Sequence, residues 1–84
     1  MEDIEKCRQK IDELDEKIQQ LLIQRFTYTD QIGQYKKEKK IAVLNSQRED
    51  EINHKIEEKY SKKEADTLKN IYQEIMKESR QRQL

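Results

Sequence analysis

The chain has 84 residues, with 18 lysine or arginine and 18 aspartate or glutamate side chains, so its formal net charge is zero. Only 32% of the residues are hydrophobic, proline is absent, and there is one glycine and one cysteine. This length predicts one domain over residues 1–84, and the composition excludes a β-sandwich or barrel, a membrane span and a disulfide scaffold. A neutral chain is a poor nucleic-acid binder, and an acidic start without an apolar segment predicts a cytoplasmic protein.

A heptad seam predicts a long first helix, from about residue 3 to about residue 40. Its positions recur at alternating steps of three and four for more than four heptads, and Arg25 is the charged residue among them. Gly33 lies inside this pattern, which continues through it, so we interpret the glycine as a packing position and not as a helix end. The seam comprises Ile4, Cys7, Ile11, Leu14, Ile18, Leu21, Arg25, Tyr28, Ile32 and Tyr35.

Two shorter helices are expected after an apolar linker at residues 41–44. Asn45 or Ser46 can cap a second helix over about 46–60. Ser61 and Glu64 have the spacing of a capping box, which predicts a third helix over about 62–82. The expected fold class is therefore all-α, with one very long helix and two shorter ones. A lone chain of this size has a thin core, which favours association between chains.

Several polar residues lie where the helical patterns require apolar ones. Arg25 in the seam is either a snorkelling or register-setting residue, or an arginine that points into a cavity to bind an anion. Lys36 lies about three turns later on nearly the same face, so both cations can reach one ligand, although a solvated lysine is the simpler interpretation. The apolar stripe of the third helix continues as Ser79 and Gln83. Either the helix end frays there, or these residues turn hydrogen-bonding groups toward the core.

Three further charged residues have structural or functional interpretations. Arg48 and Glu49 open the second helix, where a surface ion pair or a favourable helix-dipole interaction explains them without a ligand. Arg8 lies about 25 Å from Arg25 along the first helix, so the two can bind one small ligand only if Arg8 comes from a second, antiparallel chain. The single histidine and the single cysteine lack metal-ligand spacing, and there is no glycine-rich phosphate loop. We therefore expect neither a metal nor a cofactor.

Five short motifs, in register over almost the entire chain, resemble those of the all-helical chorismate mutases. The chain departs from the family pattern at Asn45, where aspartate is common, and it lacks the linker proline of many members. The second helix also looks short. The family uses a backbone N–H at the position of Asn45, so this change should be tolerated. The motifs are Arg8-x-x-Ile11-Asp12 with Asp15, Leu21-Leu22-x-x-Arg25, Gly33-x-x-Lys36, the segment from Val43 to Glu49, and Ser79-x-x-x-Gln83.

The resemblance implies an isomerase that converts chorismate to prephenate by a Claisen rearrangement, on the shikimate-derived route to phenylalanine and tyrosine. It also implies an intertwined, domain-swapped helical homodimer in which each site takes Arg8 from the other copy. Arg25 and Ser79 would hold the ring carboxylate of the substrate. Arg8 and Lys36 would hold the enolpyruvyl carboxylate, and Lys36 with Gln83 would donate to the ether oxygen.

The same resemblance assigns roles in the second helix. Glu49 would accept a hydrogen bond from the ring hydroxyl, and Arg48 would support Glu49 and the carboxylates. The backbone at Asn45 would contribute its N–H. A pericyclic reaction needs no nucleophile, metal or cofactor, and restraint of a dicarboxylate by fixed cations suits it.

Two other functions fit parts of the sequence. Isochorismate pyruvate lyase, a sister activity on the same scaffold, would use nearly the same cations. A non-catalytic antiparallel coiled-coil module would explain the seam and the high charge. Such a module does not explain why Arg25, Ser79 and Gln83 lie on apolar faces.

Overall fold

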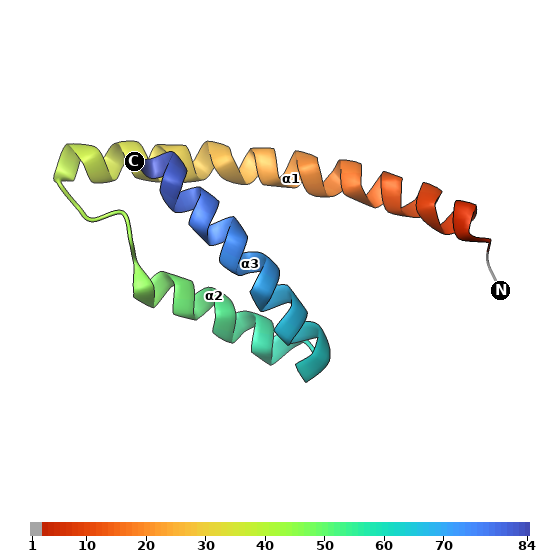
Figure 1. Cartoon of the computed structure of the whole chain (residues 1–84). Helices are drawn as coiled ribbons and strands as arrows, with labels where there is room; N and C mark the ends of the chain where they lie inside the picture. The colour runs from red at the N-terminus through yellow and green to blue at the C-terminus, as the bar shows by residue number, and fades with distance from the viewer. Residues whose placement is uncertain (1–2) are drawn as a thin grey trace.

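The computed structural model describes residues 3–84, and every regular element in that range is an α-helix. The helices follow one another as α1 (Ile4–Lys39), α2 (Ser46–Lys59) and α3 (Lys62–Gln83). Figure 1 shows α1 as a long rod, with the C-terminal end of α3 meeting its C-terminal half and α2 lying beside α3. The prediction of an all-α chain with one long and two shorter helices is therefore confirmed.

Local hydrogen bonds, from a side chain at one end and from the backbone at the other, set the two ends of α1. Asp3 caps the first turn, where its carboxylate accepts a hydrogen bond of 3.0 Å from the backbone N–H of Glu5. Lys40 ends the helix in the left-handed region at φ 56°, and its N–H donates to carbonyls of the last turn. Gly33 is buried inside the continuous helix, as the packing interpretation predicts. The basic residues of the last turn also favour this end, because they lie at the negative pole of the helix dipole.

The starts of the two shorter helices follow the predicted caps. Asn45 caps α2 by accepting a 3.0 Å hydrogen bond from the N–H of Arg48. Ser61 caps α3, and its hydroxyl contacts both the N–H and the carboxylate of Glu64. Residues 41–45 connect α1 to α2 without regular structure, as expected for the linker. In Figure 1 the linker leads from the C-terminal end of α1 to the start of α2, which packs against α3.

The core of the described chain is small. Helix α3 packs against α1 on one side and against α2 on the other. The buried apolar residues are Ile56 of α2 and Ala65 and Met76 of α3, and no large side chain of the described residues falls below 2% exposure. Thr29, Ser79 and Gln83 are equally buried but polar. The α1–α3 contact therefore carries hydrogen-bonding groups where a purely structural helix pair would carry apolar ones.

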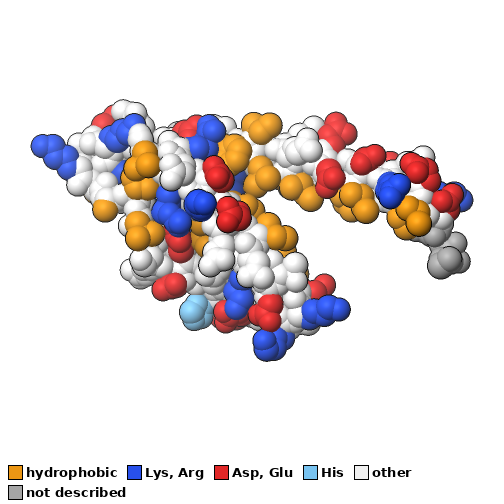
Figure 2. Space-filling model, in the orientation of Figure 1, with side chains coloured by type: hydrophobic (Ala, Val, Ile, Leu, Met, Phe, Trp, Pro, Cys, Tyr) orange, Lys and Arg blue, Asp and Glu red, His pale blue; other side chains and the backbone are white. Residues whose placement is uncertain are grey.

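The N-terminal half of α1 extends beyond the other two helices (Figure 1). The chain has a radius of gyration of 16.1 Å, whereas a compact chain of this length has about 12 Å. Figure 2 shows hydrophobic side chains along the free part of α1. No helix among residues 3–84 is long and apolar enough to cross a bilayer. The half-exposed or more exposed apolar residues of this half are Ile4, Ile11, Leu14, Ile18 and Leu21.

Candidate active site

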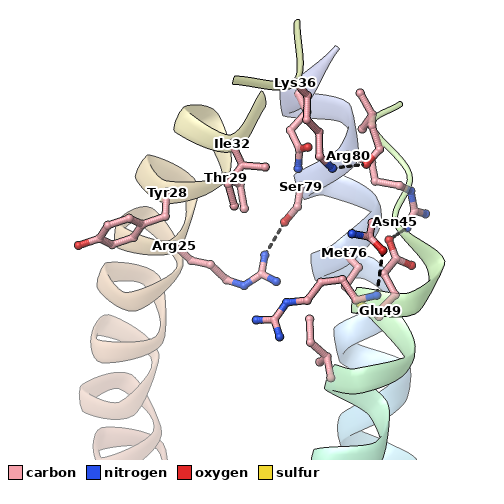
Figure 3. A pocket seen from close by; sticks show the side chains of 14 residues that line it. Arg25, Tyr28, Thr29, Ile32, Lys36, Asn45, Glu49, Met76, Ser79 and Arg80 are labelled. Atoms are coloured by element: carbon pink, nitrogen blue, oxygen red, sulfur yellow. Dashed lines mark hydrogen bonds and ion pairs between the residues drawn. The ribbon is translucent and has the colours of Figure 1, made fainter. Parts of the chain in front are cut away.

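A cavity of about 380 Å³ lies between the C-terminal half of α1, the first turns of α2 and the last turns of α3. The linker also contributes to its wall through Val43. Seven of the eight site residues predicted from the sequence line this cavity, and Figure 3 shows how several of them converge. The seven are Arg25, Lys36, Asn45, Arg48, Glu49, Ser79 and Gln83.

Arg25 and Ser79 meet across the α1–α3 contact. The Arg25 guanidinium donates to Ser79 Oγ at 2.5 Å, and Figure 3 shows this arginine pointing from α1 toward α3. The Ser79 hydroxyl in turn donates to the carbonyl of Ile75 at 2.8 Å, so its proton is used within α3. Ser79 is only 5% exposed and Arg25 is half-buried. Arg25 is therefore a held, inward-pointing arginine and not one that snorkels to solvent.

Lys36 is held against the linker. It is half-buried, and its Nζ donates a 2.7 Å hydrogen bond to the carbonyl of Val43. An ammonium group has three donors, so two remain for a ligand in the cavity. The tether also places the charge where the linker meets α2. Lys36 is thus not the solvated lysine of the simpler interpretation.

Gln83 is buried against Gly33 at the end of α3. Its side chain is 7% exposed, and its Oε1 is covered without a hydrogen-bond partner in the described chain. A Cβ at Gly33 would come within 2.9 Å of Gln83 Cγ and 3.0 Å of its Cα. Glycine is thus what lets the last turn of α3 lie this close to α1. A buried amide oxygen left unpaired costs about 1–3 kcal/mol. Because this oxygen can only accept, any donation from Gln83 to a ligand has to come from its side-chain NH₂ group.

The first turn of α2 carries the single carboxylate of the cavity. Glu49 is paired with Arg80 of α3 at 2.5 Å, and both side chains are about one-quarter to one-third exposed. Arg48 is more exposed and pairs instead with Glu51 at 3.4 Å. The resemblance gave Arg48 the role of supporting Glu49, but in the structure that contact belongs to Arg80. Arg80 also lines the cavity, and reasoning from the sequence missed it.

Arg8 is the one predicted site residue outside the cavity. It is exposed on the free half of α1, seventeen residues before Arg25 in the same continuous helix. At the rise of an α-helix the two Cα atoms are about 25 Å apart, beyond the reach of both side chains to one small ligand. The single chain therefore assembles its cavity without Arg8.

The charge balance of the cavity favours a small anion. Four cations line it, Arg25, Lys36, Arg48 and Arg80, against the one carboxylate of Glu49. This is a formal excess of three positive charges in a chain whose net charge is zero. Apolar groups such as Ile32 and Met76 complete the wall, as in most small-molecule sites. No group of three or more His, Cys, Asp or Glu side chains within residues 3–84 is arranged to hold a metal ion.

Comparison with known families agrees with the motifs. The model of the family described as chorismate mutase type II matches residues 7–84, which is nearly the entire chain. No curated protein and no solved structure matches the chain. The family is one of all-helical isomerases, in keeping with the three helices and the cationic cavity. The chain belongs to the chorismate mutase type II family.

Proposed function

We propose that this protein converts chorismate to prephenate in a cavity shared between two copies of the chain. One observation carries the proposal: residues that are far apart in the sequence and individually unremarkable line the same cavity, with an excess of cations. Chorismate is a dicarboxylate, so this charge suits it. A structural helix pair would gain nothing from burying Ser79 and Gln83 beside an inward-pointing Arg25.

In this proposal Arg25 binds the ring carboxylate. Its guanidinium has five N–H donors, and the hydrogen bond to Ser79 uses one of them. The Ser79 hydroxyl donates its hydrogen bond to the Ile75 carbonyl, so Ser79 acts on the carboxylate by orienting Arg25. Direct donation from Ser79 to the substrate would require its hydroxyl to leave that carbonyl. The resemblance alone did not separate these two roles.

Lys36 and Gln83 act on the ether oxygen. As the C–O bond breaks ahead of C–C bond formation, negative charge grows on that oxygen. Donors already fixed there bind the transition state better than the substrate, which is what lowers the barrier. Lys36 keeps two donors beside its tether to Val43, and Gln83 is buried against Gly33, which lies about one turn before Lys36 on α1. Glu49, held by Arg80, accepts from the ring hydroxyl.

The second copy supplies Arg8 for the enolpyruvyl carboxylate and covers the exposed face of α1. The chain exposes 7296 Å², whereas a compact monomer of 10.3 kDa exposes about 5,400 Å². Covering the excess on both copies would bury about 3,800 Å² in total, which is in the range of obligate homodimers. The exposed apolar residues of α1 between Ile4 and Leu21 contribute to this excess exposed area. A two-fold dimer with antiparallel α1 helices brings each Arg8 to the other copy's cavity.

The experiment is an assay of purified protein with chorismate and, separately, with isochorismate. Loss of chorismate with formation of prephenate supports the proposal, whereas release of pyruvate from isochorismate in the absence of mutase activity would make the protein a lyase. Arg25→Ala should lower kcat/KM about 10²–10³-fold, as expected for loss of a buried charged donor at a transition state. Normal activity of that variant, or no turnover of either compound by the parent protein, would contradict the proposal.

A further inference from the structure

Gln83 lies in the last turn of α3, where a helix is prone to fray unless other contacts hold it. It is the last residue of α3, and the carbonyls of a final helical turn lack intrahelical partners, so such turns fray readily. Yet its amide is buried, and its neighbours at Gly33 leave almost no room for displacement. A donor to the reacting ether oxygen must keep its place to within a fraction of an ångström. Something has to hold the end of α3 against α1.

The adjacent residue, Arg82, makes three contacts with α1. Its Nε donates to Asp30 Oδ1 at 2.9 Å, and a terminal nitrogen donates to Asp30 Oδ2 at 2.7 Å. The same guanidinium lies over the ring of Phe26, with its carbon 4.6 Å from the ring centroid. Phe26 and Asp30 are one turn apart on α1, so the planar group is fixed both at its edge and on its face.

This contact is unlike the other ion pairs of the described residues. Those between helices join α2 to α3, namely Glu57 with Lys69 and Glu49 with Arg80. Asp30 and Arg82 form the pair that joins α1 to α3. Their side chains are 45% exposed, and most ion pairs with such exposure contribute little. A two-pronged arginine–carboxylate contact that also stacks on a ring is the geometry in which an exposed pair does fix position.

The two contacts at the end of α3 act on neighbouring residues. Arg82 holds Asp30 from one side of the helix, while Gln83, about 100° further round, fits against Gly33. Asp30 and Gly33 are three residues apart on α1, so they lie on nearly one face. Together the contacts limit both the rotation and the height of the last turn of α3.

We propose that Arg82, through Asp30 and Phe26, is a positioning residue that keeps the amide of Gln83 in the cavity. This inference rests on the proposed function of Gln83 as a donor to the substrate. Arg82 does not line the cavity, so it acts on catalysis only through the place it gives to Gln83. Nothing in the motifs of the family resemblance includes Phe26, Asp30 or Arg82.

The kinetic test uses Arg82→Gln, which removes the charge and the fork but keeps a long polar side chain. We expect kcat to fall about two- to fivefold with KM changed less, a loss on the scale of one well-formed exposed ion pair. In a Gln83→Ala background the same substitution should cause no further loss. Lys62→Gln is the matched control, because it breaks an exposed ion pair with Asp66 at the far end of α3. If Arg82→Gln lowered kcat equally in the parent protein and in the Gln83→Ala variant, the proposal would be overturned.

A second measurement does not depend on activity. Amide hydrogen exchange and side-chain amide signals, followed by NMR, report the order of the last turn of α3 directly. Arg82→Gln and Asp30→Asn should both speed exchange at residues 80–83 and shift the Gln83 amide signals, while Lys62→Gln should leave them unchanged. We refer to the contact of Arg82 with Asp30 and Phe26 as the clamp. Unchanged signals in Arg82→Gln and Asp30→Asn would overturn the proposal that the clamp positions Gln83. If the parent protein lacks mutase activity but the clamp variants behave as expected, the proposed function fails and the positioning stands.

Discussion

Gly33→Ala tests how closely α3 has to approach α1. Alanine favours a helix by about 1 kcal/mol over glycine, so at an exposed position the substitution would stabilise the protein. At position 33 the new methyl group would lie 2.9 Å from Gln83 Cγ, 3.0 Å from Cα and 3.1 Å from Cβ. Ordinary carbon–carbon contact is about 3.5–4.0 Å, so the last turn of α3 has to move by roughly 0.5–1 Å. One of the three atoms belongs to the backbone, which cannot give way as a flexible side-chain end can.

The expected result is a small effect on stability and a large one on activity. Overpacking costs about 1–3 kcal/mol, and the gain in helix propensity offsets part of it, which leaves a net destabilisation of about 0–2 kcal/mol. A displacement of up to an ångström at a catalytic group can lower the rate by as much as about 10²-fold. We therefore expect kcat/KM for chorismate to fall tenfold or more, at a temperature where the variant is fully folded.

Urea unfolding and steady-state kinetics measure the two effects separately. Gln34→Ala is the matched control, since Gln34 is the next residue, is exposed, and makes only an exposed hydrogen bond with Glu38. It should keep parent activity and stay within about 0.5 kcal/mol of parent stability. A Gly33→Ala protein that is about 1 kcal/mol more stable than the parent and equally active would refute the close approach of Gln83.

Three further predictions concern single side chains. Gln83→Glu can donate to the ether oxygen only when protonated, so its mutase activity should rise toward acid pH while the parent profile stays flatter. Arg80→Gln removes the partner of Glu49 and should lower kcat/KM about tenfold for chorismate, but far less for an analogue without the ring hydroxyl. Hydrogen bonds from Arg82 hold the pKa of Asp30 below its usual 3.8. The clamp therefore stabilises the fold above that pH and is lost as pH falls through the lowered pKa, an acid transition that NMR should detect in the parent and not in Asp30→Asn.

The ends of the helices could be predicted because their causes are local. Each cap depends on residues two or three positions apart: Asp3 with Glu5, Asn45 with Arg48, and Ser61 with Glu64. The polar residues on the buried face of α3 could be predicted for the same reason, since a 3.6-residue period places Ser79 and Gln83 in line with the apolar stripe. Their low exposure confirms this part of the prediction.

The contacts that complete the site could not be predicted in this way. Arg80 pairs with a residue 31 positions away and Arg82 with one 52 positions away. In a chain with 18 cations and 18 carboxylates, no local pattern says which arginine meets which acid. The choice depends on the rotation of α3 about its own axis, which packing against α1 decides. That rotation brings Arg80 to Glu49, whereas Arg48 is the immediate neighbour of Glu49 on α2, points about 100° away and pairs with Glu51.

The position of Arg8 leads to the last prediction, which concerns the second copy. Arg8 lies about 25 Å from Arg25 on one rigid helix, and of these two residues Arg25 lines the cavity while Arg8 does not. If Arg8 acts across a two-fold interface, Arg8→Ala and Arg25→Ala should each be nearly inactive alone. When the two variants are unfolded together and refolded, a mixed dimer has one site with both defects and one with neither. Random pairing makes half of the dimers mixed, so roughly a quarter of parent activity should return.

A second pair of variants controls for this result. Arg25 and Lys36 line the same cavity of one chain, so refolding Arg25→Ala with Lys36→Ala should leave every site with at least one defect. Activity should stay at the level of the separate variants in that mixture. Recovery in both mixtures would point to refolding artefacts, and recovery in neither, with subunit exchange confirmed by mass, would exclude Arg8 from the site. A fully active protein that sediments as a monomer would contradict the shared cavity altogether, because its own Arg8 cannot reach the substrate.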